Sequence, residues 1–433
     1  MIEIQNKSEC CGCGACLQAC PHHCIDMCED EEGFLYPRVH HDICVNCGLC
    51  EKACPILNTG EPREPLKVYA AKNPDEEIRL ESSSGGVFSM LAEKIINQSG
   101  IVFGAMWNEK WEVVHGSAEN IEDIYKFRGS KYVQSYTGNT FKEVKVALNE
   151  GRKVLFSGTP CQVAGLRLYL HKEYENLLTV DFVCHGVPSP GVFRWHLQEE
   201  INNYARSASK KSDSFHPIHN IPKGDVLVPE GIEIKGISFR DKRKGWKKYS
   251  FTLTLDQTMV DGRKKTVSLS KDNNDYTWMK GIDLFLRPSC YECCQRALRS
   301  GSDITIGDYW GVHTLFPEFD DDKGASALLI NTEKGQTFTD QLDIIKRETT
   351  YQELCRLNRA LLEPSKENTG KRIFFYDKGK GLSFKERVDY LTKVSLWTQL
   401  KAMPHKVIKG LIIKLLGDKS ISKIRKVVKH VNR

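Results

Sequence analysis

The chain has 433 residues, of which 40% are hydrophobic and 27% charged, and its formal net charge is +6. This composition is typical of a soluble protein with two or three domains. The N-terminus "MIEIQNKSEC" lacks the basic and apolar parts of a secretory signal, and the late apolar stretch "VIKGLIIKLL" contains two lysines, which argues against secretion and a membrane span. We therefore expect a cytoplasmic protein, whose 17 cysteines serve as ligands or catalysts rather than in disulfides.

Two cysteine runs of the form C-x2-C-x2-C-x3-C-P occupy the first sixty residues. This is the spacing of bacterial ferredoxins with two 4Fe–4S clusters, in which the fourth cysteine of each run binds the other cluster. We therefore predict a ferredoxin domain over residues 1–60, with a hairpin between the runs. The predicted ligands are Cys10, Cys13, Cys16 and Cys54 for cluster 1, and Cys44, Cys47, Cys50 and Cys20 for cluster 2.

Other interpretations of these cysteines are less favoured. A pair of zinc sites is the alternative to the clusters, but two complete runs, each followed by proline, favour iron and sulfur. Three further cysteines lie outside the pattern, and we expect them to be small packed side chains near the clusters. They are Cys11, Cys24 and Cys28.

Strands and helices alternate from residue 61 to about residue 340, which predicts an α/β core. A strand over 66–72 precedes a Ser/Gly turn at Ser82–Gly86, and a helix then leads to a strand over 101–107. The turn offers hydroxyl and N–H groups at a helix N-terminus, where a phosphate could bind. A plain helix cap without ligand is the more common use of such a turn.

Two consecutive strand–turn–helix units follow, and each has a cysteine just after its strand. "RKVLFSGTPCQVAGLRLYL" contains Cys161, and "NLLTVDFVCHGVPSPGVFRWHLQEEI" contains Cys184. Neighbouring parallel strands would bring both to the edge of the sheet at which open α/β folds bind ligands. With Cys290 and Cys293 of a later C-x2-C pair they make the four thiolates of a third cluster. Cys294 is a rival for the fourth position, and zinc or a redox-active disulfide remains an alternative.

A flavin would connect the one-electron clusters to two-electron chemistry. The residues predicted to hold its phosphates or carbonyl are Lys131, Arg240 and Lys242, apart from the Ser/Gly turn. The alternative for the basic segment "RDKRKGWKK" is a solvated surface.

Several separate motifs of residues 1–320 resemble the coenzyme F-420 (deazaflavin) hydrogenase/dehydrogenase beta subunit family. Besides the ferredoxin runs, they are "SSSGGVFSMLAEKI", "RGSKYVQS", "LFSGTPCQVAGL", "VDFVCHGVPSP", "CYECC" and "SDITIGDYWG". The resemblance implies an iron–sulfur flavoprotein that binds FAD in the α/β core. It supports the third cluster and implies a flavin site that includes Ser83, Ser84, Gly85, Gly86, Lys131, Gly158, Thr159 and Pro160. Asp308 in "GDYWG" would lie near the active centre, and Lys131 and Asp308 are the candidate catalytic residues.

The C-terminal extension, residues 341–433, is expected to be helical and basic. Residues 371–433 contain 17 Lys or Arg and 4 Asp or Glu, a net charge of +13. Such a helix could lie on an anionic membrane surface, dock on an acidic partner or be solvated. Nucleic acid is not expected, since no base-reading module accompanies the charge.

The predicted fold is therefore α+β, with a ferredoxin domain, a flavin-binding α/β core and a basic helical tail. The predicted function is an oxidoreductase that passes electrons between its clusters, FAD and a two-electron acceptor, with ferredoxin or another carrier as partner. Bacterial relatives suggest surface polysaccharide synthesis. An electron-relay subunit and a thiol-redox sensor or reductase are the alternatives.

Overall fold

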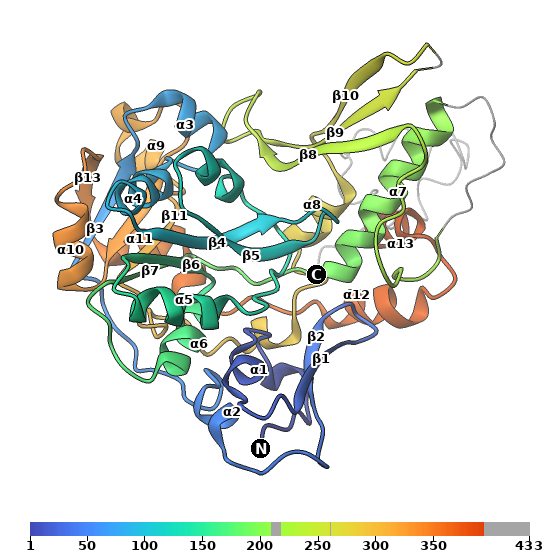
Figure 1. The fold of residues 1–433 in the computed structure, drawn as a ribbon. Coiled ribbons are helices and arrows are strands. Elements are labelled where there is room, and N and C mark those ends of the chain that lie inside the picture. Colours follow the sequence, from blue (N-terminus) through green and yellow to red (C-terminus); the bar gives the residue numbers. More distant parts are fainter. Residues whose placement is uncertain (209–217, 260, 394–433) are drawn as a thin grey trace, which may run out of the picture. The chain divides into compact units, whose positions relative to one another are not determined.

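The computed structural model describes residues 1–208, 218–259 and 261–393 (Figure 1). The chain divides into two compact units, Met1–Phe384 and Lys385–Arg433. The basic segment around Trp397, for which we expected a helix, lies outside the described residues. No helix in the described ranges is long and apolar enough to cross a membrane.

An eight-stranded mixed sheet forms the centre of the first unit (Figure 1). Strands β11, β7, β6 and β4 run parallel to one another, while antiparallel strands flank this group on both sides. In spatial order the strands are β13 (Ile345–Thr349), β3 (Lys67–Lys72), β12 (Ser326–Ile330), β11 (Ile304–Asp308), β7 (Leu177–Phe182), β6 (Val154–Gly158), β4 (Ile101–Trp107) and β5 (Val113–Ala118). The predicted strands over 66–72 and 101–107 and the neighbouring parallel pair β6–β7 are confirmed.

Helices pack on both faces of this sheet. The helices of the described residues are α1 (Ala15–Ala19), α2 (Leu49–Lys52), α3 (Glu76–Glu81), α4 (Val87–Ile96), α5 (Thr140–Asn149), α6 (Pro160–Leu170), α7 (Pro190–Ala208), α8 (Asp275–Gly281), α9 (Val312–Leu315), α10 (Glu333–Thr339), α11 (Tyr351–Leu357), α12 (Thr369–Ile373) and α13 (Phe384–Thr392). Short 3-10 turns and a π-helical turn at Phe374–Lys378 complete the helical part.

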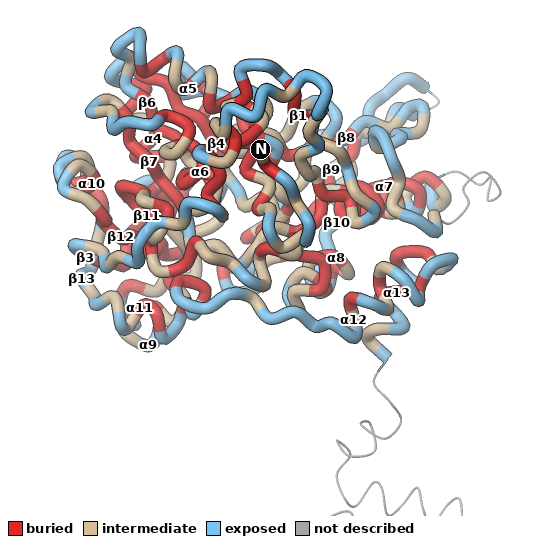
Figure 2. The backbone as a smooth tube through the Cα atoms, turned by 90° about the horizontal axis from the view of Figure 1, so that it is seen from below, coloured by how far each residue is buried: buried red, intermediate tan, exposed pale blue. Residues whose placement is uncertain are grey.

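Strand β6 shows how the core is divided between the two faces. Successive side chains of a strand point to opposite faces. Leu155 accordingly packs with Leu91 of α4 in one buried cluster, whereas Phe156 packs with Phe141 of α5 and Leu166 of α6 in another. The strands in the middle of the sheet are therefore buried on both sides, as Figure 2 shows. The carboxyl ends of β6 and β7 therefore lie side by side, at the end of the sheet where its parallel strands finish.

The N-terminal segment contains the expected antiparallel hairpin, β1 (Ile25–Glu29) and β2 (Leu35–Val39). Each cysteine run contains one short helix, α1 or α2, which begins after a glycine with a left-handed backbone, Gly14 (φ +75°) or Gly48 (φ +76°). Only glycine adopts this conformation without strain. It lets the chain turn sharply between the second and third cysteines of each run.

A separate antiparallel sheet contains the basic "RDKRKGWKK" segment. It consists of β10 (Lys264–Lys271), β9 (Ser250–Thr258) and β8 (Ile232–Asp241), in that order. Arg240 lies near the end of β8, and Lys242 follows this strand in the connection to β9. Both are buried, which contradicts the interpretation of these two residues as a solvated basic surface.

The core sheet continues beyond residue 340, where the sequence placed its boundary. Strand β13 pairs with β3 in antiparallel register, from Ile345 opposite Lys72 to Thr349 opposite Val68. The expectation of a purely helical extension is wrong for this segment. Strand β13 is the edge strand of the sheet, and charged side chains such as Lys346, Arg347 and Glu348 are typical of such an edge.

Two histidines buried in the core make stability depend on pH. Burial lowers the pKa of both His115 and His196 to about 4, below the ordinary value near 6.5. In this pH range both histidines bind a proton in the unfolded chain but not in the folded chain. The folded state therefore loses stability as the pH falls from about 7 toward 4. Between pH 7 and pH 5 each histidine should lower the free energy of unfolding by about 2 kcal/mol.

Urea unfolding of the anaerobic protein at both pH values measures this loss. His115→Gln and His196→Gln should each show a smaller difference between the two pH values than the wild type. A substitution of the exposed Gln98, which does not titrate, should leave that difference unchanged. An equal pH difference in the wild type and both buried variants would contradict the assignment.

Candidate iron–sulfur and redox site

The first cavity lies between the two cysteine runs and brings together four predicted ligands. Three come from the first run, and the fourth, Cys54, comes from the end of the second. The cysteines that line the cavity are Cys10, Cys11, Cys13, Cys16 and Cys54. Burial raises the pKa of Cys16 to about 12, so a cation is needed to keep this thiol deprotonated. This set has the donor number and type that a 4Fe–4S cluster requires.

The second cavity has the complementary composition. Three ligands come from the second run, and Cys20 comes from the end of the first. The cysteines that line it are Cys20, Cys24, Cys44, Cys47 and Cys50. The backbone N–H of Ile2 donates to Cys50 Sγ over 3.3 Å, a contact typical of thiolate ligands. The structure thus brings together the crossed sets that the ferredoxin spacing predicts.

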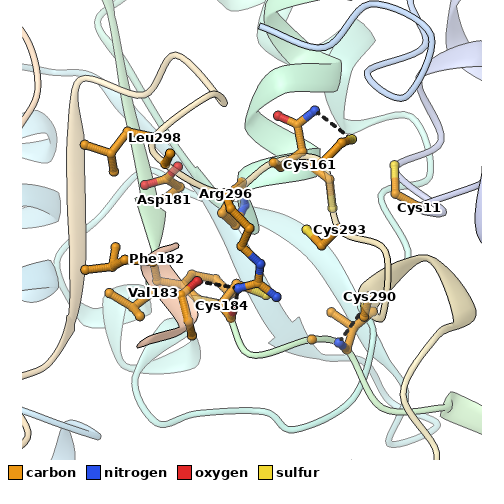
Figure 3. Close-up of a pocket in the computed structure, with 18 of the residues that line it drawn as sticks. Cys11, Cys161, Asp181, Phe182, Val183, Cys184, Cys290, Cys293, Arg296 and Leu298 are labelled. Carbon is orange, nitrogen blue, oxygen red and sulfur yellow. Dashed lines mark hydrogen bonds between the residues drawn. The ribbon is translucent and has the colours of Figure 1, made fainter. Parts of the chain in front are cut away.

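The third cavity lies at the edge of the main sheet, next to the ends of β6 and β7 (Figure 3). Six cysteines from four parts of the chain line it: Cys11, Cys161, Cys184, Cys290, Cys293 and Cys294. The structure therefore brings together the four predicted ligands of the third cluster with their rival Cys294. Within the described residues no group of His, Cys, Asp or Glu side chains is arranged around a single metal ion.

Helix α6 begins so that Cys161 faces this cavity. Thr159 caps the helix through a reciprocal pair of hydrogen bonds with Gln162, and Pro160 occupies the first turn. The Thr159 hydroxyl lies 3.1 Å from Cys161 Sγ. Gly158 ends β6, opposite Asp181 of β7, so that Cys184 follows two residues after the neighbouring strand. The equivalent placement of the two cysteines comes from adjacent parallel strands.

The protonation of these thiols argues against a free nucleophile. Hydrogen bonding with Cys11 and burial raise the pKa of Cys161 well above its usual range, and burial raises the pKa of Cys184 to about 12. A reactive thiol needs the opposite shift. A helix N-terminus lowers the pKa of a thiol, but at Cys161 burial among other thiols outweighs this effect. Metal ligation would supply the positive charge that these thiolates need.

Arg287 binds Cys10, which lines the first cavity, and no sequence motif marks this arginine. Its side chain is fully buried and lies three residues before Cys290. It donates to Cys10 O over 2.6 Å, to Cys10 Sγ over 3.3 Å, to Gln134 Oε1 over 2.9 Å and to Leu35 O over 2.8 Å. A buried cation beside Cys10 offsets the negative charge of thiolate ligands.

Arg296 has a similar place at the third cavity, where Figure 3 shows it among the cysteines. Its Nη1 donates to the carbonyls of Cys184 and Ala360, and its charge lowers the pKa of the Cys184 thiol against the larger effect of burial. The C-terminal extension thus contributes to the cavity wall. Arg287 and Arg296 lie outside recognisable motifs, and their roles depend on long-range contacts.

The candidate flavin residues fall into two groups. Ser83 Oγ lies 2.8 Å from Ser130 Oγ, beside Lys131, and Ser84 Oγ donates to Gly307 O, beside Asp308. Lys242 also reaches the Ser/Gly turn, through Ser84 O. These contacts bring together the turn, the Lys131 loop, the end of β8 and the GDYWG segment. The residues Gly158, Thr159 and Pro160 instead adjoin the third cavity through Pro160.

Three of the candidates already have protein partners. The Lys242 ammonium donates to the carbonyls of Arg79, Ser84 and Lys323 over 2.8–2.9 Å. The Gly85 N–H donates to Ser326 Oγ, and a side chain at Gly85 would collide with Ala71 O. Lys131 Nζ donates to three carbonyls of its own loop at 3.1–3.3 Å, and burial lowers its pKa to about 7. Lys242 and Gly85 thus fix the turn in place.

Arg240 is the candidate with unused donors. It forms an ion pair with Asp308, and its guanidinium lies 4.6 Å from the Tyr249 ring centre and 5.4 Å from that of Trp310. Its Nε and Nη2 atoms are buried without a hydrogen-bond partner. Buried donors of this kind normally have partners. The two unpaired donors could bind an anionic or carbonyl group of a ligand. Asp308, a candidate catalytic residue, is the ion-pair partner of Arg240 in this structure.

Two family models match the chain. Residues 9–57 match a 4Fe-4S dicluster domain, and residues 151–352 match the C terminus of the coenzyme F420 hydrogenase/dehydrogenase beta subunit. The expected family resemblance is confirmed. The chain therefore has an N-terminal ferredoxin-type domain that carries 4Fe–4S ligands, and a core related to an oxidoreductase subunit.

A solved structure and the curated proteins add little to these matches. A chain of the F420-reducing [NiFe] hydrogenase complex from Methanosarcina barkeri, studied as a xenon derivative, has 18% sequence identity and a TM-score of 0.41. The similarity covers 69% of this chain and 90% of that one. It is too distant to assign a function. No curated protein matches the sequence at a significant level.

Proposed function

We propose that this protein is an iron–sulfur flavin-dependent oxidoreductase. Cys10, Cys13, Cys16 and Cys54 would hold one 4Fe–4S cluster, and Cys44, Cys47, Cys50 and Cys20 a second. Cys161, Cys184, Cys290 and Cys293 would hold a third, next to FAD. The clusters supply one-electron transfer and the flavin two-electron transfer. An electron carrier such as ferredoxin would exchange electrons with the N-terminal domain, and a two-electron acceptor would react at the edge of the sheet.

The observation that carries this proposal is the third cavity. A ferredoxin domain alone could serve any redox protein. Here a further cysteine cavity lies at the carboxyl ends of β6 and β7, and Cys11 of the first run lines it together with the core cysteines. A site at this place connects the N-terminal domain to the part of the sheet where α/β proteins bind their ligands.

The flavin site is tested through the unused donors of Arg240. Arg240→Lys keeps the charge beside Asp308 but removes Nε and Nη2, and hydrogen bonds to charged groups contribute about 1.5–3 kcal/mol. We expect a roughly tenfold or larger increase in the dissociation constant of FAD. Arg243→Lys is the control, because this neighbouring arginine is 60% exposed in its ion pair with Asp241.

The measurement is anaerobic titration of flavin-depleted protein with FAD, followed by absorbance. Equal affinities in the Arg240 and Arg243 variants would remove Arg240 from the flavin site. A wild type that neither contains FAD nor binds it on reconstitution would contradict the proposed function itself.

A further inference from the structure

Cys11 belongs to neither set of ferredoxin ligands, yet it occupies a special position. It follows Cys10 directly and is 8% exposed. Its side chain lines the first cavity and also the third. It belongs to one buried cluster with Cys13, a predicted ligand of the first cluster, and Cys161, a predicted ligand of the third, packs against that cluster of side chains. Figure 3 shows Cys11 on the N-terminal segment, on the side where Cys161 and Cys293 lie.

The N-terminal segment that contains Cys11 packs closely against α6, which contains Cys161. Cys161 and Gly165 lie four residues apart, so they share one face of α6. A side chain at Gly165 would meet Cys13 Sγ at 3.0 Å and Ala15 Cβ at 3.4 Å. Glycine therefore allows the N-terminal segment to lie directly against the helix that presents Cys161. The sequence motif "QVAGL" contains this glycine without revealing its neighbour.

A second set of contacts fixes the backbone on the other side of Cys11. Gln134 Nε2 donates to Cys11 O over 2.9 Å, and Thr137 Oγ1 donates to Cys13 O over 2.9 Å. Arg287 holds Cys10 through its carbonyl and its sulfur. Gly12 has a left-handed backbone (φ +70°), and any side chain there would collide with Gln134 and Arg287. The core thus clamps Cys10–Cys13 on both sides of the Cys11 thiol.

The second cavity has no such connection. Its lining residues come from the N-terminal 50 residues, and it shares no cysteine with the third cavity. Cys47 is exposed, as is the neighbouring Val45. The three cavities therefore have an order: the second faces solvent, the first adjoins the core, and the third lies in the core.

We propose that Cys11 is the contact that couples the first cluster site electronically to the third, so that electrons cross between the domains there and not from the second site. This inference rests on the proposed function, because it needs a third cluster. In each transfer the group held by Cys10, Cys13, Cys16 and Cys54 is oxidised by one electron, and the group held by Cys161, Cys184, Cys290 and Cys293 is reduced by one. Cys11 is neither oxidised nor bound to iron, and no bond is formed or broken. The reverse direction uses the same contact.

The test uses anaerobic holoprotein reduced with methyl viologen radical and quenched by rapid freezing. The electron paramagnetic resonance (EPR) spectrum of each frozen sample is recorded. The EPR signal of the third site is the one that Cys161→Ala removes, and the EPR signal of the first site is the one that Cys10→Ala removes. In Cys11→Ala we expect unchanged iron and flavin contents and an unchanged rate for the first signal. The third signal should appear more slowly than in the wild type. Cys28→Ala, a half-buried cysteine of β1 in the same domain, is the control and should behave as the wild type.

Cys11→Ser, which keeps a small hydrogen-bonding side chain, serves as the second variant if the alanine variant does not fold. A third signal that appears at the wild-type rate in the variants would overturn the proposal. Loss of about four irons in Cys11→Ala would overturn it too, because Cys11 would then be a cluster ligand. A wild type that reduces both sites but never FAD would contradict the proposed function and leave this coupling standing.

Discussion

Arg287→Met is expected to lower the free energy of unfolding by about 3–5 kcal/mol, because it removes one partner from a buried charged network. The guanidinium donates to Cys10, Gln134 and Leu35, which lie far from it in the sequence. It also lies 4.2 Å from the centre of the Tyr36 ring. Methionine fills much of the volume but leaves the acceptors unpaired. The N-terminal domain should loosen from the core, and iron should be lost first from the site of Cys10.

Denaturant unfolding of anaerobic holoprotein, combined with iron analysis, measures both effects. Arg263→Met is the control, because this arginine is 85% exposed in a surface ion pair, and exposed pairs contribute about 0–1 kcal/mol. Arg287→Lys should recover part of the stability, since lysine keeps the charge but not the fork of donors. An Arg287→Met protein as stable as the Arg263 variant, with full iron content, would contradict the role of Arg287.

The second large effect concerns the crossed ligands. If three clusters are present, the wild type holds about 12 irons, and each lost cluster removes about four. Cys10→Ala combined with Cys54→Ala should remove one cluster and leave about 8 irons, because both cysteines line the first cavity. Cys47→Ala combined with Cys54→Ala should remove two clusters and leave about 4, because Cys47 lines the second cavity.

The iron contents of these two double variants distinguish the crossed assignment from the alternative in which all four cysteines of a run bind the same cluster. If each run held its own cluster, the two iron contents would be reversed, and the Cys47 and Cys54 pair would retain about 8 irons. Cys28→Ala should retain the full content, since Cys28 lies outside the three cavities. The result thus depends on which cysteines share a cluster rather than on how many cysteines are removed.

The sequence predicted most of the secondary structure that positions the cysteines. The spacing of the two cysteine runs was sufficient to predict the ligand sets in which the fourth cysteine of each run joins the other cluster. Short loops between the cysteines leave few ways to surround a cubic 4Fe–4S cluster. The strand–turn–helix repeats predicted the parallel pair β6–β7, since apolar strands and capped helices are local features. The edge strand β13 was missed, because its exposed polar residues resemble those of a helix or loop.

The parts that could not be predicted depend on contacts between distant segments. Arg287 and Gly165 have unremarkable neighbours in the sequence, and their roles follow from the packing of the N-terminal segment on α6. The sequence around Lys242 suggests a phosphate ligand, but three backbone carbonyls surround its ammonium group in the fold. The sequence predicted Cys11 to be a small packed side chain outside the ligand pattern. Its position between two cavities depends on the packing of α6 against the N-terminal segment. Long-range packing therefore decided the roles of these residues.

Cys161 and the other core cysteines are the proposed ligands of a third cluster. Iron content of anaerobically purified wild type and Cys161→Ala tests this assignment most directly, with Cys355→Ala as a control in the buried part of α11. We expect about 12 irons in the wild type and the control, and about 8 in Cys161→Ala, with the two N-terminal clusters intact. About 8 irons in all three proteins would contradict the assignment.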